Sequence, residues 1–154
     1  MTDLEVGVAN FADADVRDLI ALHQRQMYNA SPPGTSFALD LSGLERPDVT
    51  VFDARQVGEL LGIGALMQLS SAMGEIKSMR TKELALRRGV GQALLDAITF
   101  AARDRSLKLL VLETGTGPVF EPANRLYLRN GFARRSAFGN YVETEFNVFY
   151  EKRL

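Results

Sequence analysis

The fold is decided within residues 84–106, LALRRGVGQALLDAITFAARDRS, where two glycines stand directly before a segment with helical periodicity. From Val90 to Arg105 the apolar residues recur on one face, which predicts an amphipathic helix. Glycine costs about 1 kcal/mol relative to alanine inside a helix. Gly89 and Gly91 therefore indicate that another group must approach the backbone closely where this helix begins.

The start of this predicted helix suits an anion. The first backbone N–H groups of a helix have no intrahelical acceptor, and the helix dipole adds partial positive charge, so a phosphate or pyrophosphate is favoured there. Arg87 and Arg88 add full charges. The alternative is a strand-to-helix turn that needs glycine for its own conformation. A dinucleotide fingerprint does not fit, because Leu94 stands where its third glycine belongs, and the chain lacks the Gly-Lys-Ser/Thr of a P-loop.

Length and composition predict one domain over residues 1–154. The chain has 46% hydrophobic and 24% charged residues, which excludes a disordered or fibrous class. A net charge of −1 argues against a general nucleic-acid or membrane-surface partner. The absence of cysteine excludes a disulfide framework, a thiolate metal site and a cysteine nucleophile.

The chain shows no targeting or membrane signal. No basic region followed by an apolar run and a small-residue cleavage site opens it, and no apolar stretch reaches about 18 residues. We therefore expect a cytoplasmic protein with no membrane partner. The single histidine, His23, falls on the apolar face of the first predicted helix, where a packed or rim histidine is expected, and no metal site is predicted.

The order of apolar patterns predicts a mixed α/β fold. Alternating or continuous apolar runs predict strands over residues 5–11, 49–54, 59–69, 74–81, 107–113 and 146–154. Helical signals predict a first helix capped by Asp13 or Asp15, a single turn opened by a Ser42 and Glu45 capping box, the helix from Val90 to Arg105, and a short helix from Ala123 to Asn130 stopped by Gly131. The expected arrangement is a mixed sheet with helices on both faces.

The chain resembles the GCN5-related N-acetyltransferase (GNAT) family. The likeness lies in the order of a strand, a basic glycine loop, a helix, a buried strand and a short helix that carries a tyrosine. The family's acetyl-coenzyme A loop reads Arg/Gln-x-x-Gly-x-Gly/Ala, which residues 86–91 match at Gly89 and Gly91 but not at Leu86. The likeness continues through ANRLYLRNGF at 123–132. A narrower likeness to YsnE-type acetyltransferases rests on SPPGTSFALDL, GEIKSMRT, LETG and FGNY, at residues 31–41, 74–81, 112–115 and 138–141.

The resemblance implies an α/β (α+β) fold with a mixed, mostly antiparallel sheet that splays at its centre. The pantetheine arm of acetyl-coenzyme A, the co-substrate, would lie between the strands ending at Thr81 and Glu113. By analogy the backbones of Met79 and Thr81 pair with the pantetheine amides, and residues 87–93 surround the pyrophosphate. The implied coenzyme-binding residues are Met79, Arg80, Thr81, Arg87, Arg88, Gly89, Val90, Gly91, Gln92, Ala93, Asn124 and Tyr127. For Asn124 a helix N-cap is the alternative role.

Tyr127 is the predicted general acid. It lies in the family's L-Y-x-x-x-G-F context, where a tyrosine commonly protonates the departing coenzyme thiolate. A phenol with an unperturbed pKa of about 10 keeps its proton at neutral pH and can give it to a thiolate forming beside it. The alternative is a core aromatic residue.

The general base is predicted to be a carboxylate. Glu75 is preferred, because strand alternation places Glu75, Lys77, Met79 and Thr81 on one face of the strand that leads to the coenzyme loop. Glu113 is the rival, since it ends the buried strand where the sheet should open. Either glutamate has a structural alternative, as the ion-pair partner of Lys77 or of an arginine.

The predicted function is acetyl transfer from acetyl-coenzyme A to the amine of a small molecule or amino acid. The loops NASPPGTSF at 29–37 and FGNY at 138–141 are expected to converge over the acceptor, with aromatic side chains that line its pocket or close the core: Tyr28, Phe37, Phe138 and Tyr141. The alternatives are acetylation of a protein N-terminus or lysine, and a non-catalytic coenzyme A-binding regulatory module. Dimers are common among such folds, so a homodimer is compatible with this prediction.

Overall fold

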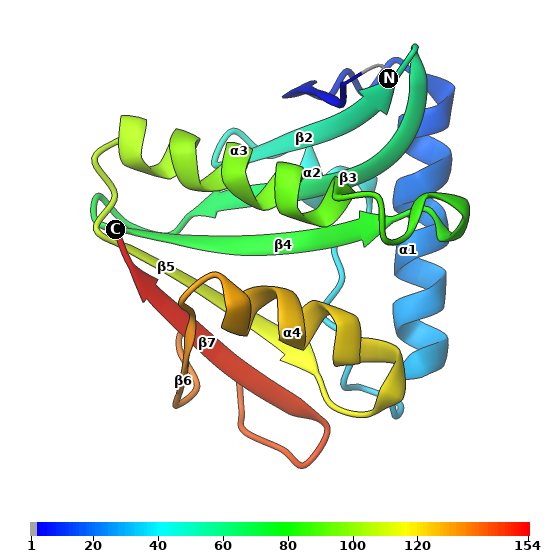
Figure 1. Cartoon of the computed structure of the whole chain (residues 1–154). Coiled ribbons are helices and arrows are strands. Elements are labelled where there is room, and N and C mark those ends of the chain that lie inside the picture. The colour runs from blue at the N-terminus through cyan, green and yellow to red at the C-terminus, as the bar shows by residue number, and fades with distance from the viewer. Residues whose placement is uncertain (1–2) are drawn as a thin grey trace.

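The computed structural model describes residues 3–154, which form a seven-stranded sheet with helices on both faces (Figure 1). The strands are β1 Glu5–Val8, β2 Val49–Gln56, β3 Glu59–Gln68, β4 Met73–Thr81, β5 Leu109–Gly115, β6 Ala133–Arg135 and β7 Asn147–Arg153. The helices are α1 Ala14–Ala30, α2 Leu41–Leu44, α3 Val90–Asp104 and α4 Glu121–Arg129, with 3-10 turns at Glu83–Ala85 and Pro118–Phe120. Within residues 3–154 no helix combines the length and the apolar character needed to cross a membrane.

The sheet is mostly antiparallel and opens at its centre, as predicted. Its strand order is β1-β2-β3-β4-β5-β7-β6, and every neighbouring pair is antiparallel except β4 with β5. The parallel pairing of β4 and β5 ends at Glu75 and Val111. Beyond that point the two strands diverge, which Figure 1 shows as the widening space between their arrows.

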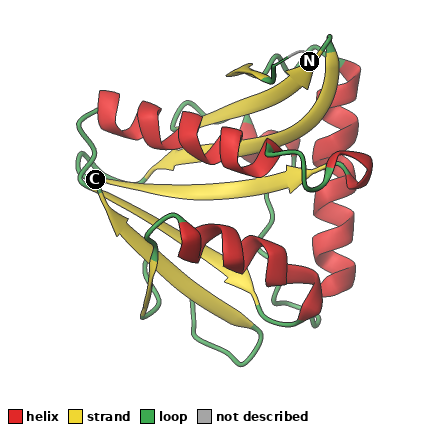
Figure 2. Cartoon of the chain, in the orientation of Figure 1, coloured by secondary structure: helices red, strands yellow, loops and turns green. Residues whose placement is uncertain are grey.

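Helices cover both faces of the sheet (Figure 2). One core packs α3 and Tyr127 of α4 against inward side chains of the sheet such as Leu66, Ile76 and Leu110. The other packs α1 against Val51, Ile63 and further residues of β2 and β3. We call these two sides the α3/α4 face and the α1 face.

A bulge in β4 contradicts the predicted strand alternation. Ala65 pairs with Lys77 and Ile63 pairs with Arg80, so the single residue between Ala65 and Ile63 on β3 faces two residues on β4. Ser78 takes up the extra length with a φ of 55°, in the left-handed region. A bulge of this kind reverses the faces of all later residues on the strand.

Glu75 and Lys77 therefore do not share a face with Met79 and Thr81, and that prediction was wrong. Met79 packs into the core under α3, and a Cβ on Gly91 of α3 would lie 4.0 Å from Thr81 Oγ1. Arg80, by contrast, contacts α1 on the side where Glu75 and Lys77 lie. Alternation alone cannot reveal an inserted residue.

Of two predicted helix caps, one is wrong and the other is confirmed in position only. The short turn α2 is capped by Asp40, whose Oδ1 accepts hydrogen bonds from Gly43 N at 2.9 Å and Ser42 Oγ at 2.7 Å, so the Ser42 and Glu45 capping box was wrong. Asp13 is the N-cap residue of α1 by position, but its side chain makes no cap hydrogen bond.

Candidate active site

The divergence of β4 and β5 leaves one edge of β4 available to a ligand. From Ile76 to Thr81 this strand pairs with β3 on one side, but no register pair within residues 3–154 joins that stretch to β5. An extended ligand with amide groups fits such an edge, because backbone N–H and C=O groups pair with amides as in strand addition.

The start of α3 shows why its two glycines are needed. Gly89 is the N-cap residue with a φ of 81°, and no side chain caps the helix. The first helical hydrogen bond runs from Ala93 N to Gly89 O, 3.0 Å, so the N–H groups before Ala93 face outward without intrahelical acceptors. At Gly91 an added Cβ would lie 3.3 Å from Leu126 Cδ2, so a side chain there would press against α4. Gly89 is thus needed for its left-handed backbone conformation, and Gly91 is needed because α4 approaches α3 closely at this position.

The side chains around this turn have mixed orientations. Arg87, with a φ of 64°, and Arg88 are exposed, and Arg88 donates to Gln56 Oε1. Gln92 and Asn130 exchange two hydrogen bonds of 2.8 and 2.9 Å, which tie α3 to the end of α4. Val90 is buried, so it can serve an anion at this turn only through its backbone.

Tyr127 and Asn124 of α4 face the same space between α4 and the sheet. Tyr127 is 4% exposed and packs against Phe132 and Tyr150, with ring centroids 5.6 and 6.1 Å away. Burial raises the pKa of its phenol above the ordinary value of about 10, so it stays protonated at neutral pH. Asn124 accepts from Tyr150 Oη at 2.7 Å and donates to Gly115 O at 3.1 Å. Because α4 begins at Glu121, the N-cap alternative for Asn124 was wrong.

On the α1 face, Glu75 sits in a buried polar cluster. Its Oε2 accepts from Tyr141 Oη at 2.6 Å and from Lys77 Nζ at 3.2 Å, and Lys77 Nζ also donates to Tyr141 Oη at 2.7 Å. The side chains of Glu75 and Lys77 are 5% and 10% exposed. The charge of this carboxylate is therefore matched by an adjacent ammonium group.

Glu113 lies beside this cluster without an ion pair of its own among residues 3–154. Burial and the nearby charge of Glu75 together raise the pKa of Glu113 to about 7. The hydrogen bond to Asn147 and the charge of Lys77 lower this pKa, but their effect is smaller. A carboxylate with this pKa changes protonation near neutral pH, which is the property a general base requires.

Three of the four predicted loop aromatics meet at this cluster. Tyr141 packs edge-on against Phe37 and Phe138, each with a centroid distance of 5.1 Å. Tyr28, on α1, is 66% exposed and does not join them. The polar role of Tyr141, as the hydrogen-bond partner of Glu75 and Lys77, was not predicted, because it depends on a contact between distant segments.

His23 pairs with Arg80 across the α1 face. Arg80 Nε donates to His23 Nδ1 at 2.8 Å. Burial, with the adjacent charge of Arg80, lowers the pKa of His23 to about 3, so the ring is neutral. A packed histidine was predicted, but this partner was not.

Comparison with known proteins decides the family. The sequence model of the Acetyltransferase (GNAT) family matches residues 16–132. The uncharacterized N-acetyltransferase YedL of Escherichia coli K12 is 44% identical over 82% of this chain and 79% of its own length. YsnE of Bacillus subtilis 168, also an uncharacterized N-acetyltransferase, is 38% identical over 98% of this chain and 100% of its own. This chain belongs to the GNAT family.

Further relatives agree with this GNAT assignment. The IAA acetyltransferase of Azospirillum brasilense is 34% identical over 90% of each chain. A crystal structure from Klebsiella pneumoniae, provisionally named an acyl-CoA N-acyltransferase, matches with a TM-score of 0.81 and 32% identity over 98% of this chain and 97% of its own. A GNAT structure from Elizabethkingia anophelis with acetyl-CoA bound has a TM-score of 0.71 and 18% identity over 98% of each chain, which shows the shared fold.

The chain is thus an acyltransferase enzyme of the GNAT family with acetyl-CoA as co-substrate, and its own features fit that molecule. The uncapped turn at Gly89 suits a pyrophosphate. The open β4 edge suits pantetheine amides. Ser78 Oγ, at the bulge within this open edge, is buried with no hydrogen-bond partner among the described residues, as expected of a group that meets a ligand.

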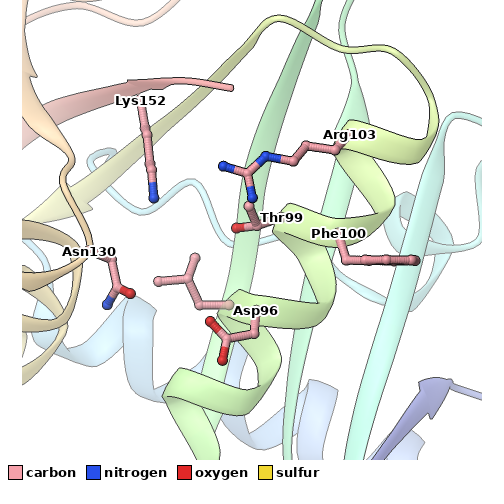
Figure 3. Close-up of a pocket in the computed structure, with 7 residues that line it drawn as sticks. Asp96, Thr99, Phe100, Arg103, Asn130 and Lys152 are labelled. Carbon is pink, nitrogen blue, oxygen red and sulfur yellow. The ribbon is translucent and has the colours of Figure 1, made fainter.

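A cavity elsewhere on this GNAT domain is unrelated to that turn. It has a volume of about 270 Å³ and lies along the C-terminal half of α3. Figure 3 shows Arg103 of α3 and Lys152 of β7 pointing into the same space. None of the predicted site residues lines it.

Proposed function

We propose that this enzyme, with residues 1–154 as a single catalytic domain, transfers the acetyl group of acetyl-CoA directly to the amine of a small molecule or amino acid. One observation carries the proposal: Tyr127 and Glu113 lie on opposite faces of the sheet, the Tyr127 phenol stays protonated, and the pKa of Glu113, raised to about 7, lets its carboxyl exchange a proton near neutral pH. An acid on the coenzyme side and a base on the acceptor side are what direct transfer requires.

In the proposed mechanism Glu113 accepts a proton from the acceptor ammonium, directly or through water. The neutral amine attacks the thioester carbonyl, the carbon–sulfur bond breaks, and Tyr127 gives its proton to the departing thiolate. The nitrogen then loses its second proton to water as the amide forms, and water returns a proton to the Tyr127 phenolate. No covalent enzyme intermediate is needed. Residues 87–93 hold the pyrophosphate mainly through backbone N–H groups, and Met79 and Thr81 offer backbone groups to the pantetheine arm.

We assign the base to Glu113 rather than to Glu75, the residue preferred from the sequence. Both Lys77 and Tyr141 donate to the Glu75 carboxylate, and these bonds must loosen before it can take a proton. The role proposed for Glu75 is to position Lys77 and Tyr141 beside the acceptor.

The α1 face has room for a small acceptor. The open cavity next to Arg80 has a volume of about 320 Å³, at the lower end of the range for small-molecule sites. The name of the Azospirillum relative adds IAA to the compounds worth screening. Acetylation of a protein N-terminus or lysine stays the second candidate within the enzyme class.

The test is release of free thiol from acetyl-CoA in the presence of a library of amines and amino acids, with mass spectrometry of the N-acetyl product. Peptides with free N-termini and lysines form the second arm. Turnover only with peptides overturns the small-acceptor proposal. Acetyl-CoA binding without thiol release in either arm indicates the regulatory module instead. Size-exclusion chromatography of the same sample tests the homodimer.

A further inference from the structure

A second charged group, Arg80, faces the acceptor side of the sheet near the open end of the gap. It lies at the end of β4 and lines the cavity of about 320 Å³ together with Val119, which follows β5, and the last turns of α1. The other lining residues are Gln26, Met27, Asn29 and Ala30. The cavity is therefore placed where β4 and β5 have already diverged.

Arg80 has no acidic partner within residues 3–154. No ion pair includes it, and its hydrogen bond is to a neutral ring. Its side chain is half-buried, and burial lowers the pKa of its guanidinium. A partly desolvated cation without a counter-ion is unfavourable, unless a ligand supplies the negative charge.

The contact with His23 fixes which part of Arg80 is available. Arginine can only donate, so the His23 Nδ1 that receives its Nε–H must carry the ring's lone pair. That bond orients the planar guanidinium and leaves both terminal Nη groups for another acceptor. Two parallel N–H groups, one from each Nη, are the arrangement that binds a carboxylate with two hydrogen bonds.

We propose that Arg80 binds the carboxylate of the acceptor, so that the acceptor is an amine that also carries a carboxylate, as an amino acid does. This inference rests on the acetyl transfer proposed above. The α1 face carries groups of both signs that suit such a zwitterion, the carboxylates of Glu75 and Glu113 for its ammonium group and the guanidinium of Arg80 for its carboxylate.

The experiment compares each acceptor with the same molecule lacking its carboxylate. The panel is the protein amino acids and their decarboxylated amines, such as phenylalanine with phenethylamine and lysine with cadaverine. Steady-state kcat and KM are measured with wild type, with Arg80→Gln and with Arg25→Gln. Arg25 is an exposed arginine of α1 that lines neither cavity, so its variant matches the change in charge.

We expect wild type to favour amino acids over their amines. Arg80→Gln should raise KM for amino acids by about 10- to 100-fold, the strength of hydrogen bonds between charged groups, with little change in kcat. KM for the amines should stay within about two-fold, because the amines carry no carboxylate. Affinity for acetyl-CoA should also stay within about two-fold, because the Arg80 side chain bonds to His23 on the α1 face and only the Arg80 backbone can meet the coenzyme. Arg25→Gln should behave as wild type.

Three results overturn the proposal. They are a wild-type preference for decarboxylated amines, an equal loss with both ligand series in Arg80→Gln, and a loss of acetyl-CoA affinity in that variant. If no member of the panel is acetylated, calorimetry with the coenzyme A complex gives the answer. Carboxylate-dependent binding that Arg80→Gln removes supports the anion site while the proposed acetyl transfer fails. No binding at all overturns both.

Discussion

The two faces of the opened sheet build their sites from different parts of the chain. On the α3/α4 face the polar groups at the Gly89 turn are backbone N–H groups, all within a few residues. On the α1 face they are side chains from distant segments. Tyr141 lies 66 residues from Glu75 in sequence, and Arg80 lies 57 from His23.

This difference explains which site can be found from sequence. A backbone site needs only a local conformation, which a short glycine pattern encodes. A side-chain site also needs strand register and loop closure, which a short window does not contain.

Gly91→Asp should remove acetyl-CoA binding almost completely. The carboxylate would stand where the pyrophosphate approaches, and we expect a loss of affinity of more than about 100-fold, or about 3 kcal/mol. The fold should survive, because an acidic residue in the first turn of a helix is favourable. The measurement is the rise in melting temperature that saturating acetyl-CoA produces, which should vanish.

Gly91→Ala is the matched control for that variant. It adds the same Cβ, 3.3 Å from Leu126 Cδ2, without the charge. Its loss of affinity should be much smaller. Equal losses in the two variants would show that crowding by α4, and not repulsion of an anion, explains the effect.

Glu113→Gln should lower turnover by about 100-fold, a typical contribution of a general base. In wild type, kcat/KM should rise with pH through about 7, because burial raises the pKa of Glu113 to about 7 and only the ionised form accepts a proton. The variant should lack this inflection, and its deficit should shrink toward the pKa of the acceptor amine. Glu75→Gln is the comparison, and an inflection near 7 lost in Glu75→Gln alone would reverse the assignment.

Glu113→Gln should also stabilise the protein at alkaline pH. The pKa of Glu113 rises from 4.5 to about 7 on folding, so the folded state holds the proton more tightly. Its contribution to stability is full below 4.5 and is lost as pH rises through about 7. Glu113→Gln should therefore melt higher than wild type at pH 8 but not at pH 4.

Tyr127→Phe should reduce kcat by about 10-fold, less than a typical general acid contributes, because a thiolate leaves readily without protonation. The ring still packs against Phe132 and Tyr150, so acetyl-CoA affinity should hold. Tyr150→Phe removes a hydroxyl bonded to Asn124 and should lower the melting temperature instead. If kcat is unchanged in Tyr127→Phe, Tyr127 is not the general acid and its role is that of an aromatic residue of the core.

Periodicity and glycine placement are local signals, and they predicted the helix positions and the turn at Gly89. The splayed sheet was predicted only by the resemblance to the GNAT family. It did not predict that Arg80 faces His23, since the bulge at Ser78 reverses the faces beyond it. Glu113 was predicted as a rival from its place at the end of a buried strand. Its raised pKa could not be predicted from the sequence, because it depends on burial and on the nearby charge of Glu75.

The smallest effect is expected at that bulge, where the two faces meet. Ser78 has a φ of 55° and a buried hydroxyl without a partner among the described residues. Ser78→Gly relieves both costs, although the higher entropy of glycine in the unfolded chain opposes this gain. The variant should raise the melting temperature by about 2–4 °C, which corresponds to about 1 kcal/mol.

Val57→Gly is the control, because Val57 has a φ of 51° in the β2–β3 hairpin and is 81% exposed. Both variants should stabilise the protein, but only Ser78→Gly should weaken acetyl-CoA binding, by a few-fold. If Ser78→Gly leaves that affinity unchanged, the hydroxyl has no part in the coenzyme site and the bulge serves only to turn Arg80 toward the acceptor.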